Sequence, residues 1–128
     1  MLQWGECQIK GHRKCGSVHG HSYKLEVYLE GELEGSMLVN FNDIKEYIRK
    51  FWDHKLIVPL EDVKIWRKAY EKLGMEDNIV GVKEPTAEII AETILSDLER
   101  LLPNINIRVV LYETPGNSVE VTGWRKIF

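Results

Sequence analysis

An alternation of apolar and polar side chains runs through residues 22–30, Ser22-Tyr23-Lys24-Leu25-Glu26-Val27-Tyr28-Leu29-Glu30. Because side chains two residues apart lie on the same face of a β-strand, this stretch predicts a strand with one buried and one solvated face. The same period returns in residues 105–113 and predicts a second strand of this kind. Strands that are apolar on one face only are typical of an antiparallel sheet covered on one side.

Helical patterns lie between these two strands. Residues 43–52 place apolar side chains at helical spacing after Asn42, a good N-cap, and predict a first helix. The clearest helix is predicted to open at Pro85-Thr86-Ala87-Glu88 and to end before Pro103, since Thr is a helix cap and Pro interrupts a helix. Residues 61–73 predict a further helix that stops at Gly74, and residues 53–59 are expected to form a loop.

The order of these elements predicts an α+β fold with helices on one face of an antiparallel sheet. Further short strands are expected in residues 2–9, 37–41, 78–83 and 118–128. The length of 128 residues fits one domain, so residues 1–128 are expected to form a single domain. Such a domain buries only about two-thirds of its unfolded surface. A large substrate pocket is therefore expected to be built between subunits.

Composition argues against several classes of function. The chain has 17 Lys and Arg against 20 Asp and Glu, and a net charge of −3 offers no basic footprint for nucleic acid. No apolar run approaches the roughly 20 residues that a membrane span needs, and no signal peptide is evident, so we expect a cytoplasmic protein. Two cysteines make no disulfide framework, which favours thiolate or metal-ligand roles for Cys7 and Cys15.

The strongest local chemical signal is His19-Gly20-His21. Two His residues that flank one residue of a strand point to the same face, and Zn²⁺ takes nitrogen and sulfur ligands. A pair of surface or turn histidines is the alternative. Cys15 lies four residues upstream beside Lys14, where neighbouring cations favour a thiolate that acts as base or nucleophile. A buried loop cysteine is the alternative there.

Three further positions carry weaker signals. Asp53-His54 follows the first helix, and an Asp can orient an imidazole for proton transfer, although a helix-end His is also common. Glu113 lies at the end of a predicted strand, where a carboxylate can bind a guanidine-like group through two parallel hydrogen bonds or remain solvated. Thr86 is explained equally well as a helix cap.

Taken together, five segments resemble the 6-pyruvoyl-tetrahydropterin synthase / 6-carboxy-tetrahydropterin synthase family, from about Cys7 to Trp124. They have the order and spacing of the family pattern and are residues 11–23, 37–41, 53–54, 85–88 and 113–114. The resemblance implies a T-fold, a four-stranded antiparallel sheet with two main helices on one face. It also implies oligomeric barrels, homotrimers or homohexamers, with active sites between subunits. The implied substrate is a small-molecule pterin, 7,8-dihydroneopterin triphosphate, and the implied reaction is of the lyase type.

The same resemblance implies a zinc cofactor. His19 and His21 match two of the family's ligands, and Cys7 aligns with its third, which is usually a His. Cysteine is a competent zinc ligand, and His12 is the alternative third ligand. The spacing Cys15-x3-His19 resembles the 6-carboxy-tetrahydropterin synthases of the queuosine and related deazapurine pathways. A 6-pyruvoyl-tetrahydropterin synthase and a non-catalytic pterin-binding paralogue are the alternatives.

The remaining roles are also carried over from the resemblance. Cys15 would move protons, aided by Asp53 and His54, and these three residues form the implied catalytic set. Glu113 would bind the 2-amino and N3 edge of the pterin, with Thr86 nearby.

Overall fold

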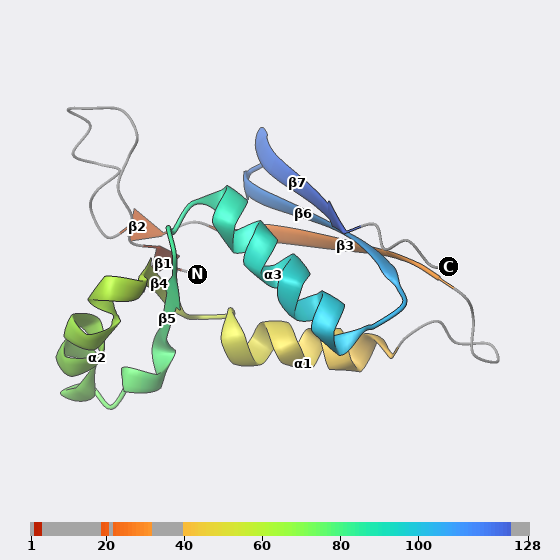
Figure 1. Cartoon of the computed structure of the whole chain (residues 1–128). Helices are drawn as coiled ribbons and strands as arrows, with labels where there is room; N and C mark the ends of the chain where they lie inside the picture. The colour runs from red at the N-terminus through yellow and green to blue at the C-terminus, as the bar shows by residue number, and fades with distance from the viewer. Residues whose placement is uncertain (1, 4–18, 21, 32–39, 124–128) are drawn as a thin grey trace.

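Two β-sheets and three α-helices make up residues 2–3, 19–20, 22–31 and 40–123, the part of the chain that the computed structural model describes (Figure 1). The first sheet is antiparallel and has the order β3-β6-β7, with β3 at Lys24–Glu30, β6 at Asn106–Thr114 and β7 at Asn117–Gly123. The second sheet is mixed and has the order β2-β1-β4-β5. The predicted α+β class is therefore confirmed.

Helices α3 (Ala87–Leu101) and α1 (Phe41–Phe51) lie on one face of the first sheet (Figure 1). The apolar side chains of the three alternating strands face these helices. Among them, Val27, Val109 and Val121 are aligned across the three strands. Burying one Ile or Leu side chain stabilises a fold by about 1.5–3 kcal/mol. The core between the helices and the first sheet contains five Ile and Leu side chains that are at most 1% exposed, together with the fully buried Val109: Ile90, Ile94, Leu98, Ile107 and Leu111.

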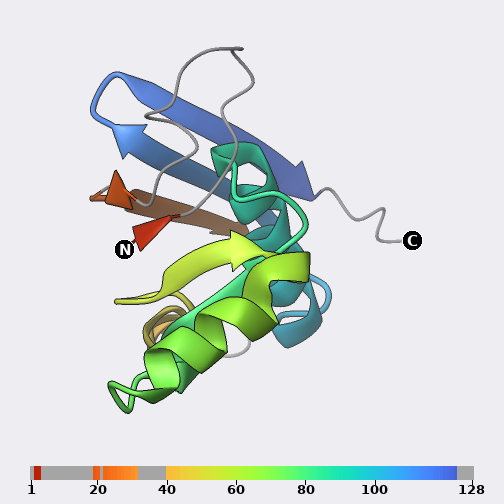
Figure 2. The ribbon, with the colours of Figure 1, turned by 90° about the vertical axis from the view of Figure 1, so that its left-hand side faces the viewer.

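The second sheet is built around β4 (Leu56–Pro59), which runs parallel to both β1 (Leu2–Gln3) and β5 (Ile79–Val82). Every residue of β4 is buried: Ile57 belongs to the main core, while Leu56 and Val58 belong to a second cluster under α2. Helix α2 (Val63–Glu71) connects β4 to β5 and lies over β5 in Figure 2. Gly81 permits this close approach, because a Cβ there would lie 2.5 Å from Val63 Cγ2.

Three details of the predicted fold are wrong or incomplete. Residues 53–59 are not a loop throughout, because 56–59 form β4. Helix α1 begins two residues early, since Asn40 is the N-cap and its side chain accepts the Asn42 N–H at 3.0 Å. The first sheet has three described antiparallel strands instead of four. The N-terminal segment expected to supply a strand is described only at β1, which pairs with β2 (His19–Gly20) and β4.

A series of hydrogen bonds between buried and half-buried side chains connects α1 to α3. The indole N–H of Trp52, a residue only 2% exposed, donates to the Tyr47 hydroxyl at 2.8 Å. That hydroxyl donates in turn to Asp97, which also pairs with Arg100. Burial and the bond to Asp97 raise the pKa of Tyr47, so its hydroxyl remains a donor at physiological pH. These hydrogen bonds therefore give the buried Trp52 N–H, at the C-terminal end of α1, an acceptor in place of water.

Replacing Tyr47 by Phe is expected to destabilise the fold by about 1–3 kcal/mol, because the buried Trp52 N–H would lose its acceptor. Urea unfolding followed by circular dichroism, at one chain concentration, measures the loss. The matched control is Tyr28→Phe, whose hydroxyl donates to Glu26 at the surface and whose removal should cost at most about 0.5 kcal/mol. Equal losses of unfolding free energy in the two variants would contradict a structural role for the hydrogen bonds from Trp52 through Tyr47 to Asp97.

Candidate functional site

The Asp53-His54 pair forms a turn between α1 and β4. The N–H groups of Trp52 and Asp53 both donate to the Ile48 carbonyl at 2.9 Å, which ends the helix. Asp53 Oδ1 lies 2.9 Å from His54 Nδ1, while the two side chains are 54% and 89% exposed. A bond from Nδ1–H to the carboxylate favours the tautomer whose Nε2 can accept a proton. The predicted pairing of these two residues is therefore present, with an imidazole that faces solvent.

The backbone of His54 has a φ of 58°, in the left-handed region that favours glycine. A side chain costs about 1 kcal/mol or more in this conformation. The left-handed turn directs the chain from the end of α1 into β4, so the imidazole occupies a position where a glycine would be easier to accommodate. An unfavourable backbone conformation of this kind is typical of positions where the side chain serves a function.

We expect His54→Gly to be more stable than His54→Ala by about 1 kcal/mol, since only Gly relieves the left-handed conformation. Both variants lack the imidazole, so the comparison isolates the backbone. Urea unfolding of the two proteins at equal chain concentration measures the difference. Equal stability would mean that residue 54 is not held at positive φ.

Glu113 lies on β6, next to Tyr112, which pairs with Lys24 at the start of β3. The side chain is half-buried, and Tyr23 is near enough that the two groups interact. Burial, and to a smaller extent the Glu113 carboxylate, raise the pKa of Tyr23. Tyr23 therefore stays protonated at neutral pH beside the predicted pterin-binding carboxylate.

Thr86 is the N-cap of α3. Its Oγ1 accepts the Ile89 N–H at 3.3 Å, so the structural role considered for this residue is present. A hydroxyl that accepts one hydrogen bond can still donate its proton to another group. The cap therefore leaves Thr86 chemically able to contact a ligand as well.

The backbone of His19 and Gly20 belongs to β2, at one edge of the second sheet. Gly20, Leu2 and Leu56 are aligned across three neighbouring strands, which places Gly20 about 10 Å from Leu56 at the usual strand spacing. Leu56 follows His54 by two residues. In Figure 1, β2, the C-terminal end of α1, the start of α3 and the β6–β7 turn all lie toward the same end of the molecule.

Most of the predicted metal and thiol residues lie outside the described part of the chain: Cys7, His12, Cys15 and His21, together with the His19 side chain. Among the described residues, no three His, Cys, Asp or Glu side chains are grouped closely enough to hold a metal. The zinc site therefore stays a prediction. No helix of the described segments is long and apolar enough to cross a membrane.

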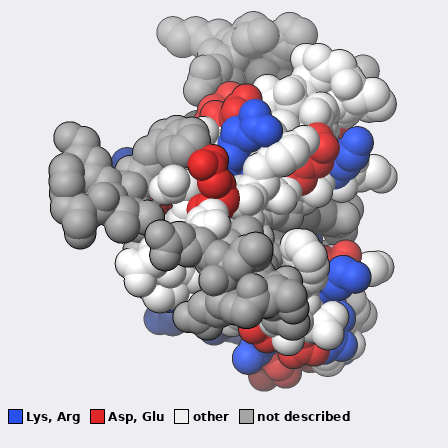
Figure 3. All heavy atoms as spheres, turned by 90° about the vertical axis from the view of Figure 1, so that its right-hand side faces the viewer, with Lys and Arg blue, Asp and Glu red and all other residues white. Residues whose placement is uncertain are grey.

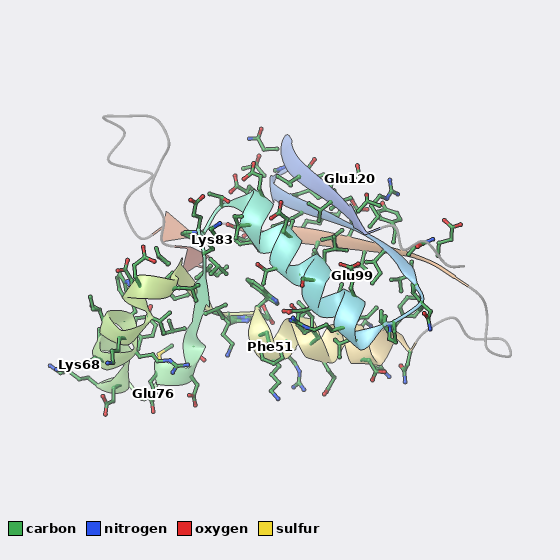
Figure 4. All side chains as sticks on the ribbon, in the orientation of Figure 1. Phe51, Lys68, Glu76, Lys83, Glu99 and Glu120 are labelled. Atoms are coloured by element: carbon green, nitrogen blue, oxygen red, sulfur yellow. The ribbon has the colours of Figure 1, made fainter. Side chains whose placement is uncertain are left out.

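Sequence reasoning missed a cluster on the sheet face opposite the helices. The Arg108 guanidinium carbon lies 4.0 Å from the centre of the Tyr28 ring, and Nη1 of Arg108 lies 3.2 Å from Oε1 of Glu120, a residue labelled in Figure 4. A hollow of about 470 Å³ lies beside them. Each residue appeared in the sequence only as the polar half of a strand alternation, so no local signal distinguished it. On the face in Figure 3, the described charges of the two signs are interspersed.

Comparison with known proteins identifies the relatives of this chain. Residues 3–123 match the family model described as 6-pyruvoyl tetrahydropterin synthase. A Pyrococcus horikoshii protein provisionally named 6-carboxy-5,6,7,8-tetrahydropterin synthase is 36% identical over 127 residues, which covers 90% of this chain and 80% of that protein. The 6-carboxy-5,6,7,8-tetrahydropterin synthase of Rickettsia conorii is 30% identical over 123 residues and 88% of both chains. The chain belongs to the 6-pyruvoyl tetrahydropterin synthase family.

Two further similarities define the breadth of this relationship. The 6-pyruvoyl tetrahydrobiopterin synthase of Pongo abelii is 29% identical over 123 residues, covering 92% of this chain and 77% of that protein. The crystal structure of 6-pyruvoyl tetrahydropterin synthase from Plasmodium vivax superimposes with a TM-score of 0.64 at 19% identity, covering 98% and 90% of the two chains. The predictions of this family and of a tetrahydropterin synthase-like enzyme are confirmed, and the fold is that of the Plasmodium vivax protein.

Proposed function

We propose that the chain is a zinc-dependent 6-carboxy-tetrahydropterin synthase. It would convert 7,8-dihydroneopterin triphosphate to 6-carboxy-5,6,7,8-tetrahydropterin, a precursor in queuosine and deazapurine biosynthesis. The observation that carries the proposal is the spacing Cys15-x3-His19-Gly20-His21. Relatives named 6-carboxy-5,6,7,8-tetrahydropterin synthase, at 30–36% identity, support the 6-carboxy product over the 6-pyruvoyl product.

The proposed donor set fits zinc chemically. Two imidazoles and a thiolate, from His19, His21 and Cys7, are nitrogen and sulfur ligands of the kind that Zn²⁺ prefers. Three protein ligands leave a fourth position for a substrate oxygen, as in catalytic zinc sites. When bound, the metal would supply Lewis acidity toward the substrate side chain.

The proton chemistry falls to the protein. Cys15 would act as the thiolate base, and His54 would accept and return protons through Nε2 while Asp53 holds Nδ1. Glu113 would accept two hydrogen bonds from the 2-amino and N3 edge of the pterin, with Thr86 as a neighbouring donor. A homotrimer or homohexamer with active sites between subunits is part of the proposal, because a chain of 128 residues has little room for an enclosed pocket.

Zinc content per chain, measured on the parent and on Cys7→Ala, tests the metal site. About one zinc per chain in the parent, lost in the variant, is the result expected if Cys7 is the third ligand. The mass of the product made from 7,8-dihydroneopterin triphosphate then tests the reaction. A 6-carboxy product supports the proposal, and a 6-pyruvoyl product favours the alternative enzyme. A parent that binds pterin but takes up no zinc after reloading would indicate a non-catalytic paralogue.

A further inference from the structure

Tyr23 joins the main core to the candidate pterin site. It continues the row of apolar side chains formed by Leu25, Val27 and Leu29 on β3, and it packs against the main core. Its hydroxyl oxygen is shielded from solvent. A tyrosine side chain has only two torsions that set its direction, so packing against the core restricts where the hydroxyl can lie.

Tyr23 and Glu113 lie at the same end of the first sheet. The last residue pair between β3 and β6 is Lys24 with Tyr112, so Tyr23 and Glu113 are the next positions outward on the two chain segments. Glu113 follows the buried Leu111 by two residues, which places it on the face of the sheet that the helices cover. The Glu113 carboxylate is near enough to Tyr23 that the two groups interact electrostatically.

Glu113 is also the extra residue of a β-bulge. Tyr112 is opposite Ser118 and Thr114 is opposite Asn117, so β7 has no residue opposite Glu113. A bulge changes the direction of a side chain, and bulges are common next to active sites. Regular pairing with β7 therefore does not fix the direction of the Glu113 carboxylate, and a neighbouring side chain can do so.

We propose that Tyr23 is a positioning residue for Glu113: its hydroxyl donates a hydrogen bond to one carboxylate oxygen and so directs the carboxylate at the pterin. An ionised carboxylate has about four acceptor sites. The 2-amino and N3 edge of the pterin would occupy two of them, which leaves one for Tyr23. This role rests on the proposed function, in which Glu113 binds the pterin. Tyr23 acts through Glu113 and does not itself contact the substrate.

Replacing Tyr23 by Phe removes the hydroxyl and keeps the ring. The dissociation constant of 7,8-dihydroneopterin is expected to rise about tenfold, because a hydrogen bond to a charged group is lost. The KM for the triphosphate should rise with it, while kcat at saturating substrate and zinc per chain should stay within about twofold of the parent. A purely structural role would instead lower kcat and the melting temperature together, and thermal unfolding followed by circular dichroism measures the latter.

A double variant tests whether Tyr23 acts through Glu113. When Glu113 is replaced by Ala the carboxylate is absent, so adding Tyr23→Phe should change the dissociation constant by less than about twofold. Independent contributions would instead make the double variant bind about tenfold more weakly than Glu113→Ala alone. Tyr112→Phe is the matched control. Tyr112 adjoins Glu113 on β6, but its hydroxyl is hydrogen-bonded with Glu26, so pterin binding should be unchanged.

Three outcomes would overturn the proposal. If Glu113→Ala weakens pterin binding and Tyr23→Phe does not, the carboxylate needs no positioning by Tyr23, and the proposed function stands. If Tyr23→Phe weakens binding equally in the presence and absence of the Glu113 carboxylate, Tyr23 acts on the pterin by another route. If Glu113→Ala leaves the dissociation constant unchanged, the proposed orientation of the pterin and the role of Tyr23 are both wrong. Zinc content and product mass test the reaction separately.

Discussion

Replacing Cys15 by Ala is expected to lower the formation of 6-carboxy-tetrahydropterin about a thousandfold, with zinc retained. A positioned acid or base contributes about 10²–10⁴ to a rate, and the thiolate is the strongest candidate base in the proposed site. Product formation at saturating 7,8-dihydroneopterin triphosphate, measured by liquid chromatography with mass detection, gives the ratio. The effect should lie in kcat, because the thiolate acts on the reacting atoms after the substrate has bound.

Two controls separate proton transfer from damage to the metal site. Cys7→Ala should lose both zinc and activity, whereas Cys15→Ala should lose activity alone. His54→Ala should also keep its zinc and should lower kcat, because its imidazole lies outside the proposed ligand set. Full turnover by Cys15→Ala with one zinc per chain would show that Cys15 has no catalytic role.

Replacing Glu113 by Ala is expected to weaken pterin binding about a hundredfold, equivalent to about 2.7 kcal/mol. Two hydrogen bonds to an ionised carboxylate are lost together, and the pterin edge is left without its acceptor. The dissociation constant of 7,8-dihydroneopterin, which lacks the triphosphate, isolates this contact from any binding of phosphate. Titration calorimetry or pterin fluorescence gives the value.

Glu113→Gln is the matched variant. It keeps the size of the side chain and one acceptor oxygen but removes the charge, so an intermediate loss of about tenfold is expected. Burial would still raise the pKa of Tyr23 in this variant, and only the smaller contribution of the Glu113 carboxylate would be lost, so that pKa should fall slightly. An unchanged dissociation constant in Glu113→Ala would reject the proposed orientation of the pterin.

The first sheet and α3 follow from local sequence, whereas the second sheet does not. Alternation in residues 22–30 and 105–113 identifies half-buried strands, and Thr86 with Pro103 brackets α3. Residues 56–59 are uniformly apolar and end in a proline, and a run of four such residues carries no period. Their strand character depends on parallel partners distant in sequence, which a local pattern does not contain.

The candidate site, like the fold, was only partly predictable from local sequence. The adjacency of Asp53 and His54 was evident, but the left-handed backbone of His54 depends on how α1 joins β4. Asn40 and Asn42 are equally good caps by residue type, and only the fold selects Asn40. Only the family resemblance suggested that Thr86 and Glu113 bind the same ligand. The two residues are 27 positions apart, and this spacing alone does not indicate a shared site.

Strand β4 contributes buried side chains to both hydrophobic clusters, and this affects how the protein unfolds. One strand supplies Ile57 to the main core and Leu56 and Val58 to the cluster under α2, so neither cluster can separate while β4 stays in place. The two layers should therefore lose structure in one cooperative event. In deuterated solvent the amide hydrogens of β4 would exchange only through that event, as slowly as those of α3, while the exposed turn at His54 exchanges early.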